Sequence, residues 1–333
     1  MHHKEKKPPY WTGQWSPIGL LLACMLWQVP VAEASNTWKV WTTQPPEHPV
    51  SAGIKRFGQL LRLKMPQIRL DIGYNASLAP QKEAIQQLHK GDIELGVFGI
   101  SPLSDTITEI RPLALPFLFH NSTHLFRVLE SPIGSRYAHK FYDAGYVVLG
   151  WYDGGTRSFY CTDPSIRTLQ DLEGRRIRVL GMQVPMVQQL GATPVPAPYK
   201  EVLSGLQQGI FDCAENNVVS YYTTGHYKVA PTLLMSNHSV SPEPLLMARK
   251  VWDGLTTEQQ KIVLTAGEES ARYMRKLWSE QVTQSMQAIK KAGVRITPLG
   301  EITEMVKKME PLYKSVLRTT NARQEMVEIL SYQ

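Results

Sequence analysis

Three arginines of this sequence lie where apolar residues are expected. Arg176 and Arg178 alternate with Ile177 and Val179 in a segment that has the pattern of a buried strand, and Arg157 follows a pair of glycines. Strands of a parallel sheet are usually apolar on both faces, so a guanidinium at the end of one must bind an anion or reach water. Arginine holds a carboxylate through two parallel hydrogen bonds, which lysine cannot do. The pattern indicates a carboxylate site, while salt bridges between lobes and solvated arginines stay open as alternatives.

Side-chain amides follow a second expected strand. Glu215, Asn216 and Asn217 come directly after the apolar segment 210–214. Ligands of open α/β sheets bind at the carboxyl ends of the strands. We therefore expect these amides to donate hydrogen bonds to the same anion as Arg178.

The sequence contains none of the common enzyme signatures, such as a phosphate-binding glycine loop, a nucleophile elbow or a zinc-protease helix motif. His120 and His124 have a spacing that suits a metal on a helix, but no carboxylate ligand lies close by, so we interpret them as exposed polar residues. Cys213 follows Asp212, and no nearby histidine would activate it as a nucleophile. We predict a protein that is not an enzyme and that uses no metal or cofactor.

One local pattern recurs along the chain and would position these residues: an amphipathic helix, a glycine and a short apolar strand. Glycine fits the left-handed residue that ends a helix. Helices that alternate with strands are typical of parallel sheets with helices on both faces. The pattern predicts helices over 50–61, 81–90, 169–173, 184–190 and 200–208, and strands over 68–74, 93–98, 176–180, 193–195 and 210–214.

The length of 333 residues is about twice that of an ordinary domain, so two lobes are expected. A long strand-like stretch over 146–160 is interrupted by Asp153, Gly154 and Gly155, which we interpret as a hinge between two α/β lobes. The predicted first lobe comprises residues 35–154 plus about 240–280. The predicted second lobe comprises residues 155–239 plus about 281–333.

The C-terminal third is expected to be helical. Capping residues around Thr256 begin a helix that extends from Thr257 to about Lys291. At 1.5 Å per residue such a helix is about 50 Å long, so it would lie across both lobes. Two shorter helices, broken near Gly267 or later, are an equally open alternative. A last helix is predicted over 302–330.

Residues 1–34 have the features of a secretory signal peptide: an N-terminal lysine cluster, an apolar run over 18–27 and small residues before a cleavage site after Ala34. A lipoprotein leader acylated at Cys24 is the less favoured alternative. The apolar run is too short to span a membrane, and the net charge of +7 is too small to favour a nucleic-acid binder. Export to the periplasm would allow Cys161 and Cys213 to pair, and two separate buried thiols are the alternative.

The order of several short motifs resembles the DctP-type solute-binding proteins of TRAP transporters, over residues 38–300. The most specific motif extends from Leu169 to Val179 and contains Arg178, while Arg157 lies in a G-x-R segment and Asn216 ends a Glu-Asn element. The sequence departs from the family at Asn217, which replaces the usual proline, and we expect a more flexible loop there. The other matching segments are 48–49, 75–78, 83–91, 115–119 and 252–260.

This resemblance implies a two-lobe periplasmic binding protein fold that closes on an organic acid. It also implies delivery of that acid to the small and large membrane subunits of an ion-driven permease. In such proteins the arginine that matches Arg178 clamps the ligand carboxylate, and the residues that match Arg157 and Asn216 assist it. Glu83 lies where some members contact a hydroxyl or an amine. A monomer without a cofactor is expected.

The segment 157–160 resembles members that bind sugar acids such as hexuronates. Tyr160, Tyr221 and Tyr222 are therefore candidates to stack on a sugar ring or to hydrogen-bond it, with simple packing as the alternative. C4-dicarboxylates, sialic acid, aromatic acids and keto acids stay open as ligands.

Two other functions stay open as hypotheses. One is a sensory module that binds the acid and signals to a membrane kinase. The other is a secreted enzyme that uses Glu83 and Glu215 as a carboxylate pair for acid–base chemistry.

Overall fold

The structure is a computed structural model that describes residues 36–299 and 302–332, which belong to one compact unit. The predicted signal peptide and its cleavage site lie outside the described residues. None of the described helices is both long and apolar enough to cross a membrane.

Within the described residues the strands form one mixed sheet of nine strands, in the order β2-β1-β3-β8-β4-β7-β5-β6, and β9 pairs with β8. Each half of the sheet is parallel: β1 pairs with β2 and β3, and β5 pairs with β6 and β7. The strands are β1 Asn36–Trp41, β2 Ile68–Gly73, β3 Leu95–Val97, β4 Tyr146–Cys161, β5 Arg176–Val179, β6 Thr193–Pro196, β7 Cys213–Asn217, β8 Thr232–Ala248 and β9 Arg295–Pro298.

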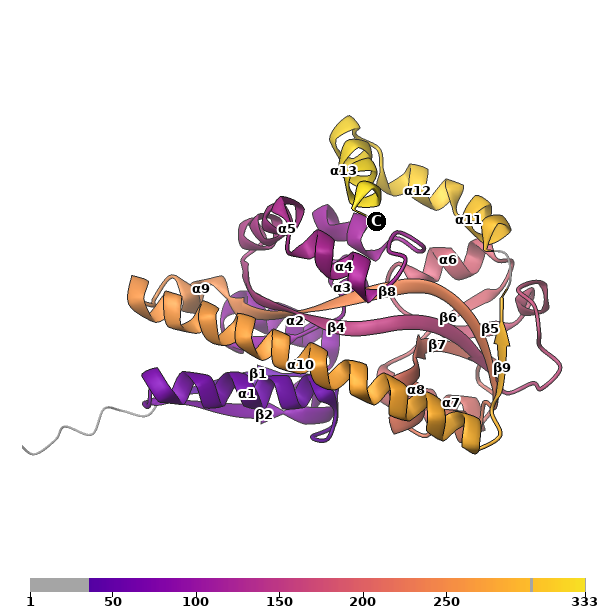
Figure 1. Ribbon diagram of the computed structural model, residues 1–333, viewed down its shortest axis with the longest axis horizontal. Helices are drawn as coiled ribbons and strands as arrows, with labels where there is room; N and C mark the ends of the chain where they lie inside the picture. The colour runs from indigo at the N-terminus through magenta and orange to yellow at the C-terminus, as the bar shows by residue number, and fades with distance from the viewer. Residues whose placement is uncertain (1–35, 300–301, 333) are drawn as a thin grey trace, which may run out of the picture. The chain divides into compact units, whose positions relative to one another are not determined.

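Two long antiparallel strands, β4 and β8, join the two parallel halves (Figure 1). β4 continues through the predicted hinge, with a register shift between Asp153 and Thr156. Gly155 has a φ of +76°, and a Cβ there would lie 2.6 Å from the Trp278 ring, so the position requires glycine. The sequence pattern predicts no strand at β8, because polar residues and two prolines interrupt its apolar run.

Most predicted helices are confirmed within a few residues, although 169–173 forms only a short 3-10 helix and the strand expected at 210–214 begins at Cys213. The α-helices are α1 Pro49–Lys64, α2 Gln81–Lys90, α3 Ile100–Leu103, α4 Ser122–Leu129, α5 Pro132–Asp143, α6 Gln183–Gln189, α7 Val202–Gln207, α8 Val218–Thr223, α9 Arg249–Trp252, α10 Thr257–Lys291, α11 Thr303–Lys308, α12 Glu310–Val316 and α13 Thr320–Ser331. The 3-10 helices are η1 Tyr74–Ala76, η2 Thr108–Ala114, η3 Gln170–Leu172, η4 Tyr199–Glu201 and η5 His226–Lys228.

Helix α10 is a single helix of 35 residues, so the alternative of two shorter helices is wrong. Thr256 and Gln259 form a capping box at its first turn. The helix contacts α1, β4 and α8, elements that precede and follow the predicted hinge (Figure 1). Gly267 does not break the helix. A Cβ there would lie 2.3 Å from the carbonyl oxygen of Leu149, so glycine allows the helix to approach β4 closely.

The single helix predicted over 302–330 is wrong, because this segment forms α11, α12 and α13. Pro311 lies in the first turn of α12 and lacks the N–H that a continuous helix would need. Helix α13 packs onto α5, where Glu325 accepts hydrogen bonds from Lys140 at 2.8 Å and from Tyr137 at 3.1 Å. This segment therefore contacts residues that the sequence assigns to the first lobe, and the predicted lobe boundaries stay a prediction.

His120 is exposed but His124 is buried, so the expectation of two exposed histidines is wrong for His124. The Nε2 atom of His124 lies 2.9 Å from the carbonyl oxygen of Ile329, and burial lowers the pKa of the ring. His124 therefore helps to hold α13 in place. Within the described residues no group of three or more His, Cys, Asp or Glu side chains is arranged to hold a metal ion.

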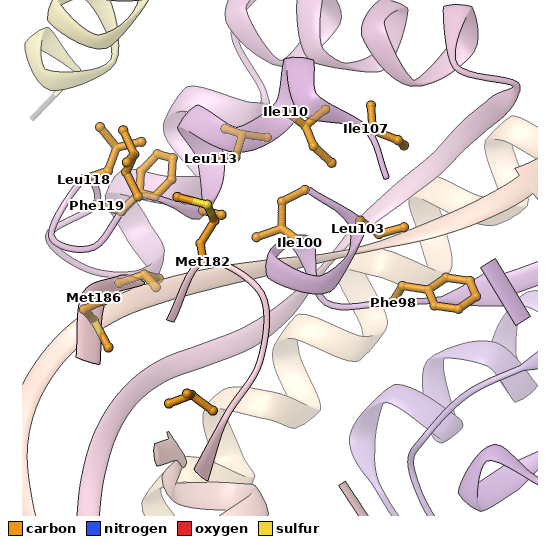
Figure 2. Packing of buried hydrophobic residues seen from close by; sticks show 14 of the residues in the cluster. Phe98, Ile100, Leu103, Ile107, Ile110, Leu113, Leu118, Phe119, Met182 and Met186 are labelled. Carbon is orange, nitrogen blue, oxygen red and sulfur yellow. The ribbon is translucent and has the colours of Figure 1, made fainter. Parts of the chain in front are cut away.

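The largest hydrophobic cluster joins the segment that follows β3 to the segment that follows β5. Figure 2 shows Leu113, Leu118 and Phe119 facing Met182 and Met186 in this cluster. The carboxyl ends of two separate strands are thus anchored on one core.

Cys161 and Cys213 form a disulfide, so the alternative of two separate thiols is wrong. The two residues are direct register partners on the antiparallel strands β4 and β7, with their Cα atoms 4.1 Å apart. The disulfide links the same two strands that carry Arg157, Glu215 and Asn216.

Candidate ligand-binding site

A polar cavity lies where the carboxyl ends of β1, β3, β5 and β7 come together beside β8. It holds about 720 Å³ of space, part of which is open to solvent. Its charged lining residues are Arg157, Arg178, Glu215 and Glu243. The cavity lies at the edge of the sheet where α/β proteins usually bind their ligands.

Arg178 lies near the end of β5 and is only 3% exposed. Its Nε and Nη2 atoms donate hydrogen bonds to the carbonyl oxygen of Ala197 at 2.9 and 2.6 Å. Within the described residues it forms no salt bridge, and burial lowers the pKa of its guanidinium. Arg176, two residues earlier, is exposed and pairs with Asp212 at 2.7 Å. Only Arg178 of these two is therefore available to a ligand in the cavity.

Arg157 also lines the cavity, but it already has an acidic partner. Its Nε and Nη2 atoms donate to the two carboxylate oxygens of Glu215 at 2.6 and 2.8 Å, and Nη1 donates to Asn216 Oδ1 at 2.9 Å. Nε2 of the buried His238 lies 3.3 Å from the same Glu215 carboxylate. Burial alone would raise the pKa of Glu215, but Arg157 and His238 outweigh burial and hold this pKa well below its ordinary value. Glu215 therefore stays ionised and neutralises Arg157.

The two asparagines after Glu215 are both buried and line the cavity. Asn216 Oδ1 accepts hydrogen bonds from Arg157 and from the backbone N–H of Asn217. The Asn217 side chain donates to the carbonyl oxygen of Gly154 at 2.7 Å and accepts from the N–H of Ser220 at 2.7 Å. Where the sequence predicts a more flexible loop, these bonds instead tie β7 to β4 and cap α8.

The structure does not bring Tyr160, Tyr221 or Glu83 to the cavity wall. Tyr160 is fully buried and its hydroxyl bonds His226 Nδ1 at 2.8 Å, while the Tyr221 hydroxyl donates to a backbone carbonyl oxygen at 2.7 Å. These are the contacts of packing residues behind β7. Glu83 is exposed on α2 and accepts a hydrogen bond from Gln87, so it does not lie with Glu215 as an acid–base pair would.

Several polar residues of the cavity wall were not among the sequence candidates, and they include Gln44, Tyr199 and Glu243. Gln44 is 6% exposed, and its Oε1 atom has no hydrogen-bond partner in the described part of the chain. Its position just after β1 was the available signal, because ligands bind where strands end. Glu243 is an acid between two prolines in a strand that the pattern did not reveal.

Hydrogen bonds also cross the cavity rim between the segments that follow β3 and β5. Ser101 donates to Gln183 Oε1 and accepts from the N–H of Met182 at 2.8 Å. These contacts connect α3 to the start of α6 beside the cavity.

Residues 41–320 match the family model of bacterial extracellular solute-binding proteins, family 7 (DctP). A solute-binding protein of Chromohalobacter salexigens is 31% identical over 89% of this chain and 88% of its own length. Members of this family are receptors for solutes and are not enzymes.

Solved structures of TRAP periplasmic solute-binding proteins have the same two-lobe fold. The protein of Roseobacter denitrificans, with bound β-D-glucuronate, superposes with a TM-score of 0.85 at 31% identity, over 88% of this chain and 98% of its own. The protein of Xanthobacter autotrophicus, with bound β-D-galacturonate, gives a TM-score of 0.86 at 32% identity, over 89% of this chain and 100% of its own. The chain described here therefore belongs to the DctP family and is a solute-binding protein of the TRAP transporter type.

Proposed function

We propose that this receptor captures a sugar acid, with hexuronates as the favoured class, and delivers it to the membrane subunits of a TRAP permease. The observation that carries the proposal is the state of Arg178. This guanidinium is buried at the cavity wall with a carbonyl oxygen as its hydrogen-bond partner and without a salt bridge in the described residues. A buried charge without a counter-ion is costly, so the site is built for an anion that arrives from outside.

The other cavity residues suit a polyhydroxy acid. Arg157 is neutralised by Glu215, which leaves Arg178 to bind the carboxylate and Arg157 and Asn216 to support it. Gln44 and Tyr199 present neutral polar groups that match the hydroxyls of a sugar ring. Two structural neighbours hold hexuronates, which have one carboxylate and several hydroxyls.

The proposed delivery step needs export and lobe closure. The predicted signal peptide would place the mature chain in the periplasm, as a monomer. Closure would occur about the segment 153–156, where β4 shifts register against β8. The closed receptor would then dock on the small and large permease subunits.

A ligand panel tests this function directly. The exported protein, unfolded and refolded to remove any retained ligand, would be screened by thermal shift and calorimetry. The panel contains D-glucuronate, D-galacturonate, the neutral sugars D-glucose and D-galactose, and succinate. A ligand at 100 times its Kd stabilises a protein by about 2.7 kcal/mol, which is readily detected. We expect hexuronates to bind and the matched neutral sugars not to bind. Equal binding of neutral sugars, or no binding of any acid, would contradict the proposal.

Permease delivery needs a separate assay. Vesicles that contain the cognate membrane subunits should accumulate labelled hexuronate only when the receptor is added. Accumulation without the receptor would contradict the delivery role.

A further inference from the structure

Glu243 is the one charged residue of the cavity wall that the carboxylate clamp does not use. It lies on β8 opposite Tyr152 of β4, and its side chain packs against Gly154. A Cβ at Gly154 would lie 3.1 Å from Glu243 Oε1, so glycine leaves room for the carboxyl group. Within the described residues this carboxyl group makes no hydrogen bond and no salt bridge.

The groups around Glu243 explain why it stays unpaired. Arg157 of β4 is the cation that faces it, but Glu215 of β7, itself in contact with His238 of β8, already holds that guanidinium. Asp153 of β4 adds a like charge, so Glu243 is left next to the open cavity without a counter-ion.

Three more titratable groups lie near Glu243 or near its neighbour Asp153. Tyr199 of η4 lines the same cavity, as does Arg178 of β5, and Arg275 of α10 faces Asp153 rather than Glu243. Burial, more than Asp153, raises the pKa of Glu243 to about 7, and Arg157 only partly opposes this rise.

A count of charges shows what the cavity can accept. Of its four charged lining residues, Arg157 and Glu215 neutralise each other. Arg178 and Glu243 remain, one cation and one acid. With Glu243 protonated, the cavity has one positive charge, enough for a single carboxylate. With Glu243 ionised, the cavity is neutral and an anion is bound less well.

We propose that Glu243 is the residue that restricts this receptor to polyhydroxy monocarboxylates, because its protonated carboxyl group hydrogen-bonds a ligand hydroxyl and its position excludes a second carboxylate. This inference rests on the proposed function. A ligand carboxylate on Arg178 adds a negative charge to the cavity and so favours the protonated form of Glu243. Binding therefore takes up a proton when the pH is above about 7.

The pH dependence follows from this linkage. Sugar-acid carboxyl groups are ionised throughout the neutral range, so Glu243 alone changes its charge on binding. Below about pH 7 the free receptor already has the proton, and affinity is constant. Above it the proton must be bound with the ligand, so affinity falls by about tenfold between pH 6 and pH 8.

Calorimetry with D-glucuronate and succinate at pH 6, 7 and 8, in two buffers of different ionisation enthalpy, tests the proposal. The wild type should take up most of one proton at pH 8, lose about tenfold in affinity from pH 6 to 8, and bind succinate at least about a hundredfold more weakly than glucuronate. Glu243→Gln should bind glucuronate with no pH dependence, take up no proton, and gain affinity for succinate. Glu258→Gln, which changes an exposed acid in the first turn of α10 away from the cavity wall, is the matched control and should keep the wild-type proton uptake.

The other possible outcomes distinguish failure of this inference from failure of the proposed function. If Glu243→Gln keeps the proton uptake and rejects succinate as before, the inference is wrong while the receptor function stands. Proton release on binding would also overturn it, since that result would mean that the complex favours the ionised form of Glu243 over the protonated form. If neither acid binds to any variant at any pH, the proposed function itself fails.

Discussion

Two arginines of the cavity differ in what surrounds them. Arg157, on β4, shares its hydrogen bonds with both carboxylate oxygens of Glu215 and with Asn216 on the adjacent strand. Among the residues that the structure describes, Arg178, at the end of β5, donates only to the carbonyl oxygen of Ala197. A carbonyl group provides hydrogen bonds but no negative charge. Arg157 is therefore satisfied within the fold, whereas Arg178 is not.

This difference separates the residues that stabilise the fold from the residue that binds the ligand. Breaking a buried ion pair leaves a charge without its partner, so a substitution in the Arg157 group should destabilise the fold. Removing a buried charge that has no partner relieves a desolvation cost, so a substitution of Arg178 should reduce binding and leave the fold stable. The two arginines should thus give opposite results in stability and binding assays.

The largest expected effect is the loss of hexuronate binding in the Arg178→Met variant. Loss of a buried, charge-assisted contact should weaken hexuronate binding by about a thousandfold, or about 4 kcal/mol. The free energy of unfolding without ligand should stay within about 1 kcal/mol of wild type or rise, because methionine carries no charge to desolvate. Calorimetry and urea unfolding of the same samples measure both quantities.

Arg176→Met is the control, since it lies on the same strand but is exposed and paired with Asp212. Its hexuronate affinity should match wild type. If Arg178→Met binds hexuronate as tightly as this control, Arg178 is not the clamp.

The second largest expected effect is a loss of folding stability in the Glu215→Gln variant. This change keeps the shape of the side chain but leaves the Arg157 guanidinium without its counter-ion. Arg157 keeps some exposure, with 16% of its side chain accessible, so we expect a loss of about 3 kcal/mol, at the lower end for a buried pair. Urea unfolding in the absence of ligand measures this loss of unfolding free energy. A loss below about 1 kcal/mol would show that solvent or the Glu243 carboxylate compensates for the missing charge.

The residue pattern points to the two arginines for the same reason, and only the family resemblance gives them different roles. Arg178 lies near the end of an expected strand and Arg157 just after the hinge glycines, and in both places a guanidinium needs an anion. Their difference depends on a pairing between β4 and β7 that places Arg157 opposite Asn217 and beside Glu215. Such lateral pairing of distant segments is not encoded in any local pattern, so the charge balance of the cavity appears only in three dimensions.

Local sequence patterns predict helices and strands well where short-range interactions determine them. Helix α10 begins and ends where its capping residues and apolar face indicate, and each parallel half of the sheet follows from the helix–glycine–strand repeats. The sequence pattern does not predict elements whose structure depends on contacts with distant parts of the chain. Strand β8, with Glu243 between two prolines, is held by pairing with β4 along its length. Helix α13 does not continue α12, and hydrogen bonds from His124 of α4 and Lys140 of α5 hold it in place.

The smallest expected effect is the response of the paired region to acid. The pKa of Glu215 is held below its ordinary value by Arg157 and His238, in spite of burial. An acid whose pKa is lower in the folded state stabilises the protein above its unfolded pKa, about 4.3, and this contribution is lost as the pH falls below it. The wild type should therefore lose up to about 1.4 kcal/mol more per pH unit than Glu215→Gln below pH 4.3. Unfolding free energies of the two proteins at pH 5, 4 and 3 give this difference, and other carboxylates cancel because both proteins have them.

Glu243 should respond to pH with the opposite sign. Burial raises its pKa to about 7, so its folded form prefers the proton and its contribution to stability falls as the pH rises from about 4.3 to 7. The wild type should therefore lose stability relative to Glu243→Gln over this range. Parallel curves for wild type and Glu243→Gln would mean that solvent reaches the Glu243 carboxyl group as freely as in the unfolded chain. In that case the cavity would select its ligands through Arg178 alone.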